Sequence, residues 1–231
     1  MTHVRQVTDA FAVRTADELE ELVREWGFLP FFRSRVPGFS VEEHTPRELW
    51  FSDEEDGPWE WKGPIAARRG CIYGKLFEKK AGFVSREWLP DLLNYRRDGY
   101  DMDARYDEGL APHKDLLLWE ALREHGALLT PEWKRLTGYV KGGNTGFDTA
   151  VTRLQMQTYV TVERFDYMTD KWGRAYGWGV ARFTTPEALF GEEAVAQAYA
   201  RPPAQSRERI AAHLRRLLPH ADDVQIGRLI G

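Results

Sequence analysis

The amino-acid sequence predicts an α+β fold, because its hydrophobic period changes near residue 157. Before this point, apolar residues recur every three to four positions, which is typical of amphipathic helices. From 157 to 165, aromatic and β-branched residues alternate with a period of two, which is typical of a strand. Residues 170–174 then form a hairpin loop in which Gly173 can adopt a positive φ, and Ala175–Thr184 is the return strand. We therefore expect helices followed by a β-hairpin.

Three short helices are expected before the hairpin. The first is Asp115–His125, which Gly126 ends. The second begins with Thr130 as N-cap and Pro131 at the first helical position, and it ends before Gly138. The third follows a glycine-rich loop, and its buried face is formed by Phe147, Ala150, Val151 and Leu154. Three helices followed by a hairpin predict a winged-helix module, that is, a helix-turn-helix with a β-hairpin wing.

The expected organisation has three parts: an N-terminal tryptophan-rich α+β part (1–110), the winged-helix module (111–190) and a helical C-terminal extension (191–231). In the N-terminal part, a capping box at 15–18 opens an amphipathic helix that ends at Gly27. Strands are expected at 48–51, at 59–64, and in two runs around the turn at 79–80. The remaining expected elements are a charged loop at 96–109 and helices at 186–199, 206–218 and 222–231.

Composition limits the classes of protein. The chain has 42% hydrophobic and 29% charged residues, and its polar N-terminus and lack of a long apolar run predict neither a signal peptide nor a membrane span. The single cysteine, Cys71, excludes an internal disulfide and a cysteine-based zinc cluster and favours a cytoplasmic location. A net charge of −4 does not favour nucleic-acid binding, but residues 113–185 carry a net +2 against −5 for residues 38–112. The expected module is thus the more basic part.

Two glutamines at the junction of the third helix and the hairpin are the candidate catalytic residues. In the extended backbone expected there, the side chains of Gln155 and Gln157 point to the same side. Their amide oxygens could accept hydrogen bonds from one water, and their nitrogens could donate to a base or phosphate. The alternative is that they cap the helix or satisfy neighbouring main-chain groups.

The third helix and the wing are the candidate nucleic-acid-binding surface. The helix presents Thr149, Thr152 and Arg153, which are suitable types for base edges or phosphates. The wing presents residues that could contact the nucleic-acid backbone or stack on an exposed base: Lys171, Trp172 and Arg174. The alternative is that Arg153 pairs with an acid and that the wing residues are solvated. A winged helix can also bind a protein, and the net charge permits this.

Other candidate sites are weaker. The acidic runs 42–44 and 53–56 could be imagined as metal ligands, but a solvated loop is expected, since no histidine stands at ligand spacing from the second run. The tryptophans at 50, 59, 61 and 88 could line a pocket, and core positions are expected instead. No phosphate-binding loop, dinucleotide fingerprint or Ser/His/Asp set is present, so neither a metal nor a cofactor is expected.

The run Leu154-Gln155-Met156-Gln157 resembles the Gln-x-Gln motif of the AlkZ/YcaQ-like DNA glycosylases, which are built of tandem winged helices and release alkylated bases and unhook interstrand crosslinks. More of the chain is similar to a family of smaller AlkZ-related proteins, through residues 146–157, 176–180 and 185–190 and the runs at 73–75, 82–85 and 95–100. The resemblance implies association with DNA. It also implies that Gln155 and Gln157 position the water that attacks an N-glycosidic bond. Thr158-Tyr159 differs from the Asp-Pro that often follows the glycosylase motif.

Two functions therefore remain open from the sequence. The first is a DNA-associated hydrolase of N-glycosidic bonds, and the second is a non-catalytic winged-helix module that binds nucleic acid or a protein partner. The sequence fixes neither the lesion nor the oligomeric state.

Overall fold

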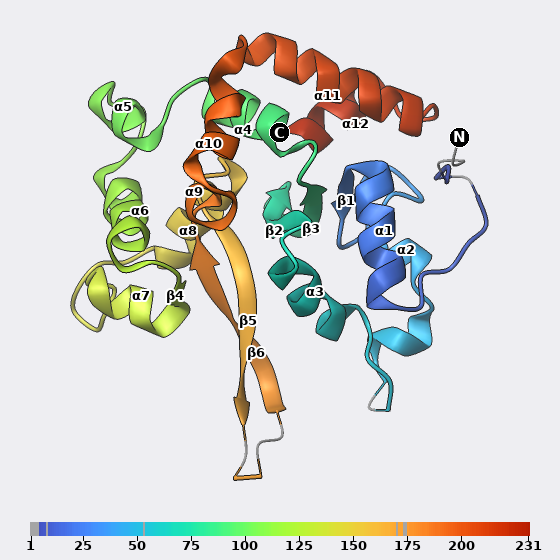
Figure 1. The fold of residues 1–231 in the computed structure, drawn as a ribbon, viewed down its shortest axis with the longest axis horizontal. Helices are drawn as coiled ribbons and strands as arrows, with labels where there is room; N and C mark the ends of the chain where they lie inside the picture. The colour runs from blue at the N-terminus through green and yellow to red at the C-terminus, as the bar shows by residue number, and fades with distance from the viewer. Residues whose placement is uncertain (1–4, 8, 53, 170, 173–174) are drawn as a thin grey trace.

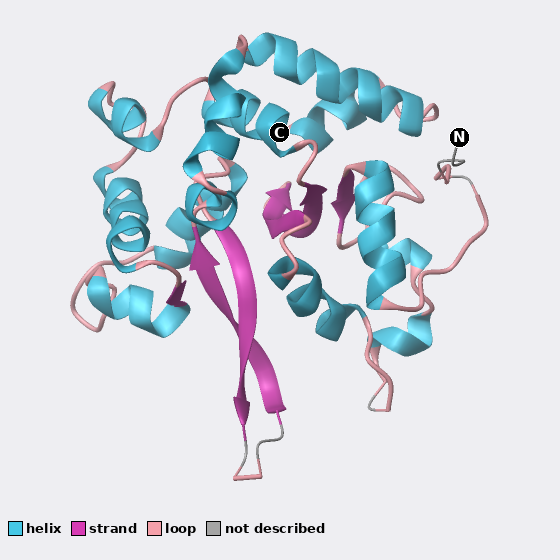
Figure 2. Ribbon diagram, in the orientation of Figure 1, coloured by secondary structure: helices cyan, strands magenta, loops and turns pink. Residues whose placement is uncertain are grey.

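An α+β fold is present, as predicted, in the computed structural model, which describes residues 5–7, 9–52, 54–169, 171–172 and 175–231. Its described strands form one six-stranded antiparallel sheet in the order β1-β3-β2-β5-β6-β4. Helices surround this sheet, and the β5–β6 hairpin projects beyond the rest of the molecule (Figure 1; Figure 2).

The first helix confirms Thr15 as its N-cap but not the full capping box, because the Glu18 carboxylate accepts from the Arg14 N–H at 2.7 Å and not from the Thr15 N–H. Helix α1 spans Ala16–Trp26, and the Thr15 hydroxyl accepts a hydrogen bond from the Glu18 N–H at 3.2 Å. Its apolar face is fully buried and consists of Leu19, Leu22, Val23 and Trp26. The short strand β1, Phe28–Pro30, follows at once and pairs with β3.

Two strand predictions for the N-terminal part are wrong. Residues 48–50 lie in the 3₁₀ helix η1 (Arg47–Trp50), which follows the short helix α2 (Val41–His44), and Phe51 is the C-cap of η1. Residues 59–64 lie in helix α3, Pro58–Ala67. Pro58 presets the helical φ at the first position, and the Glu60 carboxylate accepts a hydrogen bond from the Gly57 N–H at 3.0 Å, so the local chemistry is that of a helix start.

The strands around the turn at 79–80 are confirmed as β2 (Cys71–Phe77) and β3 (Lys80–Ser85). Helix α4, Leu89–Arg97, follows. The segment expected as a charged loop contains a further helix, α5 (Met102–Asp107), whose N-terminus is capped by Asp101 through a hydrogen bond of 2.8 Å from the Ala104 N–H.

The expected helices and hairpin of the central part are present. The elements are α6 (His113–His125), β4 (Leu128–Leu129), α7 (Thr130–Leu136), α8 (Phe147–Met156), β5 (Thr161–Thr169) and β6 (Ala175–Thr184). Strand β4 pairs with β6, whereas β5 pairs on its other side with β2 at Tyr73↔Val162. The sheet therefore continues from the N-terminal part into the central part.

The strand expected to begin at residue 157 begins only at Thr161, because α8 ends in a Schellman motif. Thr158 takes the left-handed conformation (φ 63°) and donates its N–H to the Gln155 carbonyl at 2.9 Å, while the Tyr159 N–H reaches the Leu154 carbonyl at 2.9 Å. Tyr159 is fully buried. Gln157 is thus the C-cap of a helix and not part of a strand.

The C-terminal part is helical, as expected. The helix expected at 186–199 is divided into α9 (Pro186–Phe190), α10 (Glu192–Ala196) and the 3₁₀ helix η2 (Gln197–Ala200), because Gly191 has φ +92°. Helices α11 (Pro203–Leu217) and α12 (Asp223–Ile230) follow, and α11 lies across α4 (Figure 1). None of the helices in the described ranges combines the length and the apolar character that crossing a bilayer demands.

One hydrophobic core extends through the molecule. Trp50 and Trp61 are buried in it, and Trp59 and Trp88 pack against it, which agrees with the core interpretation of the tryptophan-rich part.

Candidate functional site

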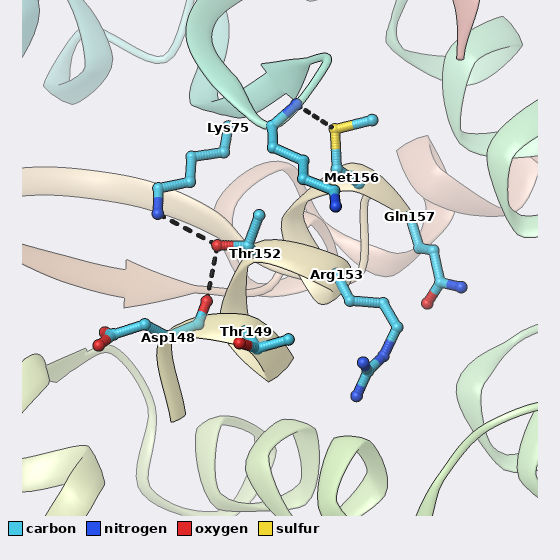
Figure 3. Close-up of a pocket in the computed structure, with 8 residues that line it drawn as sticks. Lys75, Asp148, Thr149, Thr152, Arg153, Met156 and Gln157 are labelled. Carbon is cyan, nitrogen blue, oxygen red and sulfur yellow. Dashed lines mark hydrogen bonds between the residues drawn. The ribbon is translucent and has the colours of Figure 1, made fainter. Parts of the chain in front are cut away.

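A cleft of about 660 Å³ lies between the outer face of α8 and the turn that joins β2 to β3 (Figure 3). We call it the α8 cleft. Its lining side chains contain three cations and one carboxylate, so it is positively charged: Lys75, Lys79, Asp148, Thr149, Thr152, Arg153, Met156 and Gln157. The cleft therefore unites four residues proposed from the sequence (Thr149, Thr152, Arg153 and Gln157) with two lysines from the N-terminal part.

Gln155 does not face this cleft. Its side chain is 3% exposed, and its amide oxygen accepts a hydrogen bond from the Lys75 main-chain N–H at 2.9 Å. The amide nitrogen donates to the Val151 carbonyl at 3.3 Å. A Cβ at position 74 would stand 2.8 Å from the Gln155 oxygen, so a larger residue than Gly74 would push this oxygen away from its present position. Gln155 thus joins the helix to the sheet.

Gln157 is placed differently. It is half-buried, it borders the α8 cleft, and its carboxamide makes no hydrogen bond within the described part of the chain (Figure 3). The expectation that the two glutamines project together from extended backbone is wrong, because helical geometry and the Schellman turn put Gln155 on the inner side of α8 and Gln157 at its end. One carboxamide remains available to a ligand.

Arg153 is held by an acid, as the alternative interpretation has it. Its Nε donates to Asp115 Oδ2 at 2.6 Å, and its Nη2 donates to the other carboxylate oxygen. Asp115 is only 1% exposed. These hydrogen bonds raise the pKa of Arg153 and fix its guanidinium at the edge of the cleft. Part of its hydrogen-bonding capacity is thus used within the protein.

The other side of the cleft is formed by lysines of β2 and its turn. Lys75 Nζ donates to the Thr152 hydroxyl at 3.1 Å, and that hydroxyl donates to the Asp148 carbonyl at 2.6 Å (Figure 3). The Lys79 main-chain N–H contacts Met156 Sδ at 3.4 Å, which anchors the turn against α8. No hydrogen bond or ion pair of the Lys79 ammonium, or of the Thr149 hydroxyl, occurs among the residues described here. Both groups can meet a ligand.

The wing residues lie apart from the α8 cleft. Lys171 and Trp172 are exposed near the end of the β5–β6 hairpin, with Lys171 Nζ 4.2 Å from the centre of the Trp172 ring, and neither lines the cleft. Arg174 lies outside the described residues. The structure therefore does not bring Lys171 and Trp172 into one site with the proposed helix residues.

Sequence reasoning missed Lys75 and Lys79 as site residues. They stand 77 residues from their partners on α8, and in the sequence they belong only to a strand and a charged turn. No local pattern could have identified them, since the sheet pairing of β2 with β5 brings them to α8.

The acidic candidates of the N-terminal part have structural roles. Glu43 accepts hydrogen bonds from the Ser40 hydroxyl at 2.6 Å and the Gly38 N–H at 2.9 Å, and His44 Nε2 lies 2.7 Å from the Gly38 carbonyl. Among the residues that the structure describes, no group of three or more His, Cys, Asp or Glu is placed to hold a metal ion. Of the acidic run 53–56, Asp53 lies outside the described residues.

Comparison with known proteins gives one match. A family model described as AlkZ related matches residues 13–231, nearly the whole chain. No curated protein and no solved structure matches.

Proposed function

The chain belongs to the AlkZ-related family, and from this membership and the geometry of the α8 cleft we propose that it binds DNA. The order α6, β4, α7, α8, β5, β6, with β4 paired to β6, supports a winged-helix module at 111–190. The division into 1–110, 111–190 and 191–231 is part of this proposal, with the first two parts sharing one sheet.

The observation that carries the proposal is the unpaired Gln157 carboxamide beside two lysines in one cleft. The β2–β3 turn stands opposite the outer face of α8, so that face forms one wall of a cleft and cannot lie flat in a major groove. A single unstacked nucleotide suits this geometry better. Its phosphate would lie near Lys75 and Lys79, and its base edge would meet Gln157, which both donates and accepts.

Binding is tested by fluorescence anisotropy on three labelled DNAs: a matched duplex, the same duplex with one mismatched base, and a single strand. We expect the mismatched duplex and the single strand to bind more tightly than the matched duplex, because their bases leave the stack at a lower cost. Lys79→Ala and Gln157→Ala should weaken binding. The matched control is Lys80→Ala, an exposed lysine one position along that does not line the cleft. Equal losses for Lys79→Ala and Lys80→Ala would contradict the α8 cleft as the site.

The second candidate function is hydrolysis of an N-glycosidic bond, which Gln157 favours. A carboxamide cannot take a proton at neutral pH, but it can orient a water and stabilise developing charge by its dipole. Gln155 and Gln157 are the two candidate catalytic residues, and the main-chain bonds of Gln155 leave the water-positioning role to Gln157.

Release of bases from alkylated and crosslinked DNA decides between the two functions. Release by the wild-type protein that is lost in Gln157→Ala, at a protein concentration high enough for this weaker-binding variant to bind all of the DNA, would support the hydrolase. Salt-dependent binding with no base release from either protein would leave the binding module alone.

A further inference from the structure

A second cavity, of about 640 Å³, lies between helices α5 and α6 on one side and α9, α10 and η2 on the other. We call it the acidic cavity. Its charged lining residues are four carboxylates and one guanidinium: Asp101, Asp103, Glu187, Glu192 and Arg123. Leu122 and Val195 add apolar surface. The lining of this cavity is thus negatively charged, whereas that of the α8 cleft is positively charged. The acidic cavity would repel DNA phosphates.

Arg123 already occupies the place of a cation in this cavity. Its guanidinium carbon lies 4.7 Å from the centre of the Trp119 ring, and its Nη1 lies 3.3 Å from Asp103 Oδ2. The side chain is more than half exposed, so solvent screens the pair and the contact is weak. A second cation could therefore displace Arg123 at little cost.

Two residues that line the cavity each carry a solvent-inaccessible polar atom that has no hydrogen-bond partner among the described residues. One is the indole N–H of Trp119, a side chain that is only 6% exposed. The other is Oε2 of Glu187, whose Oε1 accepts a hydrogen bond from Arg97 at 2.6 Å. A buried donor and a buried acceptor without partners are costly. Because Arg123 lies over the Trp119 ring, the indole N–H points to a ligand that displaces Arg123 and supplies an acceptor.

We propose that the acidic cavity binds a basic segment of a partner protein. An arginine or lysine side chain of that segment replaces Arg123 over Trp119 and beside Asp103. Displacement of Arg123 uncovers the Trp119 side chain, and a main-chain carbonyl of the segment accepts from the indole N–H. A polyamine fits the charge but offers no acceptor to Trp119, which favours the peptide.

The test is an NMR titration that follows the indole N–H signals of the full-length protein. The probe is the blocked peptide acetyl-Ala-Arg-Ala-Lys-Ala-amide, and the control peptide carries glutamine at both basic positions. The Trp119 signal is identified by its loss in Trp119→Phe, or by its selective shift in Arg123→Gln if the first variant does not fold. We expect the basic peptide alone to shift this signal to saturation.

Three variants make the test specific. Glu192→Gln and Asp103→Asn should each raise the dissociation constant of the basic peptide about fivefold, since each removes one charge contact. Arg123→Gln should lower it, because the resident cation no longer competes. Asp107→Asn, an exposed acid of α5 that does not line the cavity, should leave it unchanged.

Several outcomes would overturn the proposal. They are an unmoved Trp119 signal, an equal shift with the glutamine peptide or with spermidine, and an Asp107→Asn effect as large as that of Glu192→Gln. Weaker binding in Arg123→Gln would also overturn it, because Arg123 would then be part of the site and not a competitor.

Discussion

The α8 cleft and the acidic cavity are similar in volume, at about 660 and 640 Å³, but they carry opposite charge. Three cations face one carboxylate in the first, and four carboxylates face one cation in the second. The net charge of −4 for the whole chain describes neither region. A protein partner or a nucleic acid responds to the local field of a cleft, so charge summed over the sequence is a poor guide to the ligand.

The two regions also differ in how their charges are held. In the α8 cleft, Lys75 and Lys79 are exposed, and Lys79 makes no ion pair within the described ranges. In the acidic cavity, Glu187 is fixed by Arg97, which is 1% exposed and donates to Glu187, to the Tyr199 hydroxyl at 2.9 Å and to the Thr158 carbonyl at 2.8 Å. The acidic wall therefore depends on the packed interior, whereas we expect removal of the exposed lysine side chains of the cleft to leave the fold unchanged.

The largest expected effect is that of Arg97→Ala. The substitution leaves Glu187 without its partner and removes the guanidinium that lies 4.6 Å from the centre of the Tyr159 ring. We expect the free energy of unfolding to fall by about 3 kcal/mol or more. Urea denaturation measures this loss. Lys79→Ala is the comparison and should stay within about 0.5 kcal/mol of wild type. Equal stability of the two variants would contradict the view that the charges of the acidic cavity, but not those of the α8 cleft, depend on the packed interior.

The two glutamines provide a matched pair inside one helix end. Gln155→Ala leaves the Lys75 N–H and the Val151 carbonyl without their side-chain partner, and it should lower the free energy of unfolding by about 1–3 kcal/mol. Gln157→Ala removes no intramolecular hydrogen bond of the described chain, so we expect a change below about 0.5 kcal/mol. Thermal unfolding of both variants checks this. If Gln157→Ala were the more destabilising, its carboxamide would have a structural role.

A smaller effect concerns the salt dependence of DNA binding. If Lys75 and Lys79 each neutralise a phosphate, each alanine substitution should reduce the slope of log affinity against log salt concentration by about 1. Glu192→Gln in the acidic cavity should leave that slope unchanged. Anisotropy titrations at several salt concentrations measure it. A reduced slope in Glu192→Gln would mean that DNA also contacts the second region.

The smallest expected effect is at Cys71, which begins β2, the strand that carries Lys75. Burial raises the pKa of its thiol from 9.0 to about 12, so the native state keeps the proton that the unfolded chain loses first. This contribution to stability is complete below pH 9.0 and is lost as the pH rises toward about 12. At pH 8, we expect Cys71 to react with a disulfide reagent only after denaturation. If the Cys71 thiol reacted fast with the reagent in folded Lys75→Ala or Lys79→Ala, the substitution would disturb the sheet itself.

Much of the fold followed from local patterns. The N-cap at Thr15, the apolar face of α8 and the hairpin β5–β6 were all predicted close to their observed positions. The segments 48–51 and 59–64 were misassigned because short aromatic runs fit a strand and a helix equally well, and the decision came from helix-start chemistry at Gly57–Pro58. The candidate site was predicted only on its α8 side.

Local patterns are enough to predict most of the helices, the hairpin and the polar outer face of α8, because these properties depend on neighbours a few positions apart. Which glutamine stays available, and which cations stand opposite it, follows from the packing of distant segments. Helix α8 ends at Met156, and the left-handed Thr158 that follows the C-cap Gln157 turns the chain away from the helix axis. The β2–β5 pairing brings Lys75 and Lys79 to Thr152 and Met156, each 77 positions away in the sequence. Contacts between residues so distant in the chain depend on how the whole sheet is assembled, and no local spacing encodes them.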